Sequence, residues 1–187
     1  MSESSEAKLS LPNVVVYPDA RLRQVSAKVE QVDDKVRADF DTLAKCMYHY
    51  NGLGIAGVQV GIMKKLFCVD QDYITRKTAD SSIAPVGKPL YFANAEIIEK
   101  SSELILMPDG CISVPNVFSK TQRHAKVTVK YLDYNNHEQV IHASGLLGFC
   151  IQHETDHTNG KLFFDLLSPL KKKLLLDQYA KILKNRD

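Results

Sequence analysis

The chain has 187 residues, of which 44% are apolar and 25% charged, and its formal net charge is +2. This composition excludes disordered, fibrous and collagen-like classes, and the length predicts one domain. The small net charge does not indicate a nucleic-acid partner, so we expect no sequence-specific nucleic-acid binding. No apolar stretch approaches the ~20 residues that span a bilayer, so we expect no membrane partner.

The N-terminal segment is polar. Residues 1–10 lack both the apolar stretch of a secretory signal and the Arg-rich, acid-poor character of a transit peptide. We therefore expect a flexible tail over 1–10, a single domain over 11–187 and a cytoplasmic protein. An organellar copy that has lost its presequence fits the same sequence.

The first half of the domain begins with a helical pattern. Apolar residues recur at spacings of three and four over 33–50, which predicts an amphipathic helix. Three glycines over 52–57 then predict a tight loop, and the apolar run 66–70 predicts a buried strand. Residues 73–90 are rich in Thr, Ser, Pro and Gly, so we expect a surface excursion there.

The second half combines strands and helices. A turn-rich loop is predicted around 108–115, and alternation over 126–134 predicts a half-buried strand whose partner, 139–143, returns after a hairpin turn. A helix is predicted from 144 to 157, and a Lys-rich final helix from about 169 to 185. Strands with helices before, between and after them indicate an α+β fold.

The strongest chemical signal is the H-E-x-x-H pattern 153-HETDH-157 on the predicted helix. His153 and His157 are four residues apart, so their rings lie on one helical face within reach of a single cation. Glu154 is the next residue of the helix after His153, where its carboxylate can reach an attacking water without being a metal ligand. Two surface histidines on a polar turn are the alternative.

A catalytic metal site of this kind needs a third protein ligand and an open position. Cys111 follows Gly110 in a predicted turn, where a thiolate can project freely, whereas the other cysteines lie in apolar runs typical of small core residues. A thiolate with two imidazoles suits Fe, Zn, Ni or Co better than Mg or Ca. Nothing in the pattern marks the remaining histidines as ligands: His49, His124, His137 and His142.

Three segments, 52-GLGIAGVQ-59, 109-DGCIS-113 and 153-HETDH-157, together resemble the signature motifs of the peptide deformylase family, in the same order. The flanking segments 17–30 and 145–173 resemble its bacterial, type 1 form. The resemblance implies antiparallel or mixed sheets packed round a central helix that carries H-E-x-x-H, with a further C-terminal helix. It also implies removal of the formyl group from the formyl-methionine of nascent peptides, with release of formate.

The resemblance assigns roles to residues of this chain. Cys111, His153 and His157 would hold the metal, which in this family is natively Fe(II), with Ni, Co or Zn able to occupy the site. Glu154 would be the general acid and base. The oxyanion hole would be formed by Gln59 and the backbone N–H of Ile112.

The resemblance also implies where the substrate lies. Gly54 and Gly110 would run alongside its backbone. The pocket for the methionine side chain would be lined by Leu53, Met107, Leu146, Phe149 and Cys150.

The chain departs from the family pattern at several positions. Asp109 replaces the usual Glu, Gly57 an Ala and Phe118 a frequent Arg, and Phe149 is bulkier than the usual aliphatic residue. We expect Asp109 still to pair with Arg123 and hold the loop of the cysteine ligand. These departures leave open a metal-retaining binding module that has lost turnover or changed specificity.

Two further alternatives remain open. An H-E-x-x-H metalloprotease would recruit a downstream third ligand, and Asp165 is the nearest candidate, although eight residues past His157 is a poor fit. The basic segment 171–186 fits either a solvated helix whose leucines, including Leu174, pack on the domain, or the ribosome contact that the family resemblance implies.

Overall fold

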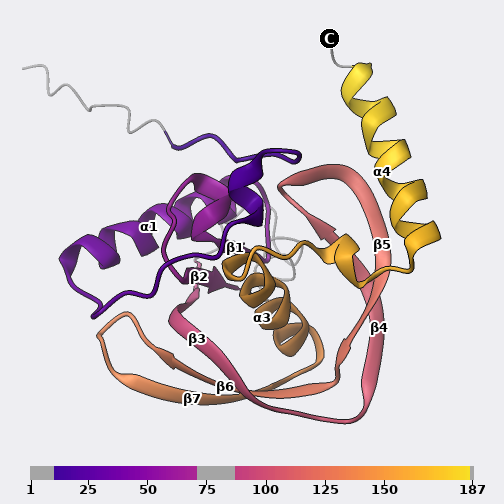
Figure 1. The fold of residues 1–187 in the computed structure, drawn as a ribbon. Helices are drawn as coiled ribbons and strands as arrows, with labels where there is room; N and C mark the ends of the chain where they lie inside the picture. The colour runs from indigo at the N-terminus through magenta and orange to yellow at the C-terminus, as the bar shows by residue number, and fades with distance from the viewer. Residues whose placement is uncertain (1–10, 71–86, 186–187) are drawn as a thin grey trace, which may run out of the picture.

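The computed structural model describes residues 11–70 and 87–185. The predicted tail at 1–10 and most of the predicted excursion at 73–90 therefore lie outside the described residues. Figure 1 shows one helix, α3 (Gly145–Thr158), in the centre of the molecule, with strands on both sides of it. This arrangement confirms the predicted α+β class, in which sheets surround the helix that carries the H-E-x-x-H motif.

The larger sheet has five antiparallel strands in the spatial order β1-β2-β3-β6-β7. The strands are β1 (Gly54–Ala56), β2 (Leu66–Val69), β3 (Leu90–Lys100), β6 (Lys126–Leu132) and β7 (Glu138–Ser144). The predicted hairpin between β6 and β7 is present. It turns at Asn136, which has a φ of 65°, a left-handed conformation that asparagine tolerates better than most residues.

Helices cover both faces of this sheet near β2, whose four residues are all buried. On one face, α1 (Asp34–His49) contributes Phe40 and Leu43 to a cluster that includes Leu66. On the other face, Ile151 of α3 belongs to a cluster that includes Phe67. A strand buried on both faces reads as a continuous apolar run, which is why the sequence predicted it correctly.

The second sheet is a two-stranded antiparallel ribbon of β4 (Leu104–Cys111) and β5 (Val114–His124). The predicted loop around 108–115 is wrong for most of its length, because only residues 112 and 113 lie between these strands. Pro108 and Gly110 prompted that prediction. Each strand of a two-stranded ribbon is an edge strand, and edge strands tolerate Pro and Gly.

The final helix, α4 (Pro169–Lys184), lies along β5 (Figure 1). Its buried residues are Leu175 and Tyr179, and the Tyr179 hydroxyl donates a hydrogen bond of 2.9 Å to the carbonyl of Tyr17. Leu174 was expected to pack on the domain, but it is 60% exposed. It precedes the buried Leu175 and therefore points about 100° away round the helix. None of the described helices is long and apolar enough to cross a membrane.

In the described part of the chain, three short 3-10 helices connect these elements: η1 (Ala20–Arg23), η2 (Gly57–Val60) and η3 (Phe163–Leu166). Asp165 of η3 ties the N-terminal segment to α4, since its carboxylate pairs with Arg23 and with Lys172, the latter at 2.6 Å. It also accepts a hydrogen bond from the Leu162 N–H at 2.9 Å. Burial alone would raise the pKa of Asp165, but the Arg23 and Lys172 hydrogen bonds lower it to about 2.

We expect Asp165→Asn to lower the free energy of unfolding by about 1 kcal/mol at pH 7, because part-exposed ion pairs of this kind contribute on that order. A folded-state pKa below the unfolded value stabilises at higher pH, so the difference from wild type should shrink as the pH falls from about 4 toward 2. Urea unfolding at several pH values measures this. Asp177→Asn on the exposed side of α4 is the control, and a difference as large at pH 2 as at pH 7 would contradict the assignment.

Candidate metal centre

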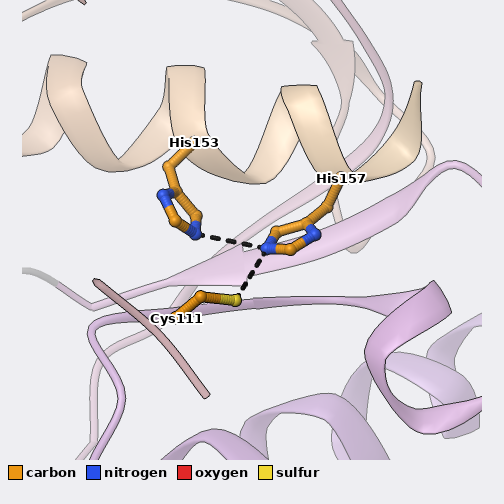
Figure 2. A group of neighbouring side chains, drawn as sticks. All are labelled: Cys111, His153 and His157. Carbon is orange, nitrogen blue, oxygen red and sulfur yellow. Dashed lines mark hydrogen bonds between the residues drawn. The ribbon is translucent and has the colours of Figure 1, made fainter. Parts of the chain in front are cut away.

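Three predicted ligands from two distant parts of the chain converge at one point (Figure 2). Cys111 ends β4, whereas His153 and His157 lie one turn apart on α3. The Cys111 Sγ lies 3.1 Å from the His157 Nε2, which lies 3.2 Å from the His153 Nε2. The imidazoles are 7% and 1% exposed, so both point into the protein, as the helical pattern predicted.

This donor set fits a divalent first-row metal. The three ligand atoms lie within 4.8 Å of one another. Ligands at ~2.0–2.3 Å in a tetrahedral site would be separated by roughly 3.3–3.6 Å, close to what the side chains show. Within residues 11–70 and 87–185, no other group of three His, Cys, Asp or Glu side chains converges in this way.

Asp109 holds the first histidine in place. Its Oδ1 lies 2.8 Å from the His153 Nδ1, which leaves the Nε2 of that ring turned toward Cys111. A carboxylate behind a histidine fixes the tautomer and ring orientation that metal ligation needs. The methylene that Asp109 lacks relative to Glu is therefore no obstacle to this contact.

Asp109 is in turn held from the neighbouring strand β5. Its Oδ2 accepts a hydrogen bond of 2.7 Å from the Thr121 hydroxyl and lies 3.3 Å from the Arg123 guanidinium, which also pairs with Asp156 at 2.7 Å. The predicted Asp109–Arg123 pair is thus present. Burial opposes the charge on Asp109, but the hydrogen bond with His153 and the Arg123 charge lower the pKa of Asp109 overall.

Gln59 lies beside the cysteine. Its Oε1 accepts a hydrogen bond of 2.8 Å from the Ala56 N–H, which turns its Nε2 toward the Cys111 Sγ at 3.4 Å and the Ser113 Oγ at 3.2 Å. The Ser113 N–H also donates to the same sulfur at 3.4 Å. Two donors from different elements, η2 and the β4–β5 turn, therefore point at this one sulfur. Nothing in the sequence marked Ser113 as functional beyond its place in the segment 109-DGCIS-113.

Glu154 is 4% exposed, and its Oε2 has no hydrogen-bond partner among the described residues. Burial raises the pKa of Glu154 to about 7, a value at which a carboxyl group can both accept and donate a proton near neutral pH. Gly54 makes room for this side chain, because a Cβ at that position would lie 2.7 Å from the Glu154 Oε1.

A cavity of about 510 Å³ opens beside these groups. Cys111, His153, Glu154 and Gln59 line it, together with most of the residues expected to contact substrate: Leu53, Gly54, Gly110, Ile112, Leu146, Phe149 and Cys150. Met107 is not among the lining residues, since it lies four residues before Cys111 on an extended strand, a distance of about 13 Å. The lining residues that the sequence did not indicate include Asn51, Pro108, Asn116 and Phe118.

The other candidate ligands lie elsewhere. His124 and His142 are held by Ser101 and Thr128, and neither belongs to the cluster. Asp165, the alternative third ligand of a metalloprotease, is paired with Arg23 and Lys172. The geometry therefore gives no support to a third ligand downstream of His157.

We expect Asp109→Asn to weaken metal binding by about 10–100-fold, the usual effect of altering a residue behind a ligating histidine. Competition with a chelator measures the affinity, and thermal unfolding of the metal-free protein reports any loss of stability separately. Asp156→Asn removes the more exposed partner of Arg123 and serves as the control, with a smaller effect expected. Equal metal affinity in wild type and Asp109→Asn would contradict the role of Asp109.

Comparisons with known proteins agree with this site. Residues 11–173 match the family model for polypeptide deformylase. The chain is 40% identical over 178 residues to a peptide deformylase from Rickettsia canadensis, which covers 95% of this chain and 99% of that one, and 35% identical to one from Rhizobium meliloti, over 95% and 97%.

Solved structures agree as well. The peptide deformylase of Ehrlichia chaffeensis superposes with a TM-score of 0.83 at 34% identity, over 95% of this chain and 99% of that one. A complex of the Ehrlichia enzyme with actinonin gives a TM-score of 0.80 at 35% identity, over 92% and 98%. The fold, the converging Cys and His side chains and these likenesses lead to one conclusion: the chain belongs to the polypeptide deformylase family, metal-dependent hydrolases that remove N-formyl groups.

Proposed function

We propose that this chain hydrolyses the formyl group of formyl-methionyl nascent peptides and releases formate, with a divalent metal held by Cys111, His153 and His157. The observation that carries the proposal is the position of Glu154. Its buried carboxylate has an unpartnered oxygen and lines the same cavity as Cys111 and His153.

When bound, such a metal acts as a Lewis acid and lowers the pKa of water from 15.7 to about 7. Glu154 takes the proton of the attacking water on its carboxylate and then delivers it to the departing amine nitrogen. Its burial serves this role, because a carboxyl group with a pKa of about 7 is not trapped in one protonation state at neutral pH.

The negative charge that develops on the formyl oxygen needs hydrogen-bond donors. We assign these to the Gln59 Nε2, which lies 3.4 Å from the Cys111 Sγ, and to the N–H of Ile112, the next residue after Cys111; all three residues line the cavity. The bond from the Ala56 N–H fixes the Gln59 amide in advance. To donate to the formyl oxygen, the Nε2 must exchange one of its contacts with Cys111 and Ser113. Removing one such donor typically costs ~2.7–4 kcal/mol of transition-state stabilisation.

The apolar wall of the cavity fits the methionine side chain. Leu146, Phe149 and Cys150 of α3 line it, and burial raises the pKa of the Cys150 thiol to about 12, so this side chain stays neutral. We assign Gly54 and Gly110, which line the same cavity from β1 and β4, to contact with the peptide backbone; the space that a Cβ would take at each is filled by Glu154 and by the Phe118 ring.

We assign Fe(II) as the metal in the cell, with Zn, Ni or Co able to take its place in purified protein. The thiolate and imidazole donors suit all four ions. We propose that the protein acts in the cytoplasm, or in an organelle with its own ribosomes, because formylated nascent peptides arise on ribosomes.

We expect Glu154→Gln to lower kcat for formyl-Met-Ala-Ser by roughly 10²–10⁴-fold, because it removes the proton carrier but keeps the shape of the side chain. Formate release by anaerobic, metal-defined protein measures this, and metal content should stay equal to wild type. A wild-type protein that holds stoichiometric metal but releases no formate would favour the binding module instead. Cleavage of casein without formate release would favour a metalloprotease.

We also propose that α4 contacts the ribosome through its exposed lysines. Lys171 and Lys173 are exposed, whereas Lys172 is occupied by Asp165. The exposed leucines Leu170 and Leu174 lie beside them, which leaves a mixed basic and apolar face that the domain does not use.

We expect the double variant Lys171→Glu, Lys173→Glu to lose co-sedimentation with ribosomes at low salt, because contacts with RNA phosphates depend on cationic side chains and weaken steeply with salt. Formate release from a short free peptide should stay within twofold of wild type. Lys45→Glu on the exposed face of α1 is the matched control. Co-sedimentation equal to that of the control would count against the contact.

A further inference from the structure

Phe118 is the most exposed of the large apolar side chains in the described part of the chain, at 76%. It lies on β5 directly opposite Gly110 of β4, one residue before Cys111. Its ring leans over that glycine, since a Cβ at position 110 would overlap the ring. An aromatic ring that covers a glycine on the neighbouring strand is a known way to stabilise a sheet edge, but that contact leaves three quarters of the residue in solvent.

Phe118 continues an apolar row on the outer face of the ribbon. Alternate side chains of a strand point to the same face, so Leu104, Leu106 and Pro108 of β4 lie on one face of the ribbon, together with Gly110. Phe118 of β5 is paired with Gly110, so its side chain lies on that face as well. Leu104 and Leu106 are 49% and 58% exposed. We call Leu104, Leu106, Pro108 and Phe118 the ribbon row.

The ribbon row enters the cavity at one end only. Phe118 and Pro108 line the cavity together with Cys111 and Glu154, whereas Leu104 and Leu106 do not. Phe118 therefore lies at the mouth, between the reacting groups and the open outer face of the ribbon. A ring in this position can contact the part of a ligand that extends from the cavity into solvent.

In the proposed reaction, a peptide leaves the cavity on the side of the ribbon. With the formyl group at the Cys and His cluster and the methionine side chain against Phe149 and Cys150, an exit past Gly110 carries the following residues toward Pro108 and Phe118, which line the cavity. An extended peptide advances about 3.3 Å per residue and turns alternate side chains to the same side. One of the first two side chains after methionine therefore faces the ring of Phe118.

The charge beside the ring decides which side chains it favours. Lys120 is exposed two residues further along β5, on the same face of the ribbon as Phe118. Its ammonium group disfavours a Lys or Arg side chain of the peptide, although an aromatic ring alone would attract a cation. An aromatic or large aliphatic side chain of the peptide carries no charge and is not repelled by Lys120.

We propose that Phe118 is a specificity-determining residue, which selects peptides with an aromatic or large aliphatic side chain at the first or second position after the formyl-methionine. This inference rests on the proposed deformylase function. It concerns the peptide beyond the methionine and not the metal or the chemistry of the formyl group.

The test compares two peptide series, formyl-Met-X-Ser and formyl-Met-Ala-X, in which X is Phe, Leu, Ala or Lys. In wild type, kcat/KM at one of the two positions should be roughly three- to tenfold higher for Phe than for Ala, the usual range for an aromatic contact, and lowest for Lys. Phe118→Ala should bring the ratio of Phe to Ala close to one through a change in KM. Phe118→Tyr should keep the preference.

Leu104→Ala is the matched control, because it removes another exposed side chain of the ribbon row far from the mouth. It should keep the wild-type preference. A preference that survives in Phe118→Ala, or that Leu104→Ala abolishes equally, would overturn the proposal.

A binding measurement separates this inference from the proposed function. The dissociation constants of the same peptides for metal-loaded Glu154→Gln protein should follow the same order, and Phe118→Ala in that background should remove it. Turnover without any preference for Phe over Ala would overturn the role of Phe118 and leave the deformylase function standing. If wild-type protein binds the Phe peptide more tightly than the Ala peptide but releases no formate, the deformylase function is overturned and the role of Phe118 in peptide selection stands.

Discussion

The contact between Asp109 and His153 joins the two halves of the site. Asp109 belongs to the β4–β5 ribbon and His153 to α3, and their side chains meet at 2.8 Å in an interior where each is almost fully buried. A buried carboxylate is stable only when charges and hydrogen bonds surround it. Thr121 and Arg123 supply these from β5, so the ribbon, the helix and the first ligand are held in one arrangement.

The central position of α3 lets one helix serve three purposes. Its His153 and His157 face Cys111, its Glu154 faces Gly54 of β1, and its Phe149 and Cys150 form a wall of the cavity. Because α3 is surrounded by strands, the functional carboxyl group is desolvated, and its pKa rises to about 7. The burial that builds the core therefore also adjusts the acid and base of the proposed reaction.

The sequence-based predictions failed where a local sequence pattern and the tertiary contacts of the residue disagree. Pro108 and Gly110 indicate a loop by local preference, yet they are strand residues because a two-stranded ribbon tolerates them at its edges. Met107, which the family resemblance implies for the pocket, lies on β4 and is not among the residues that line the cavity. Leu174 follows the apolar pattern of α4 and still faces solvent, because burial depends on what lies beside the helix.

The sequence by itself predicted α1, α3 and α4, the buried strand β2 and the three side chains that converge as candidate metal ligands. Helical periodicity and the four-residue spacing of His153 and His157 are local properties, so they can be read without a fold. Only the tertiary structure decided that Asp109 contacts His153, that Ser113 donates to Cys111 and that Phe118 lies at the mouth of the cavity. These contacts depend on the register of β4 and β5 and on where the ribbon meets α3. A shift of one residue would turn every side chain of a strand to its other face.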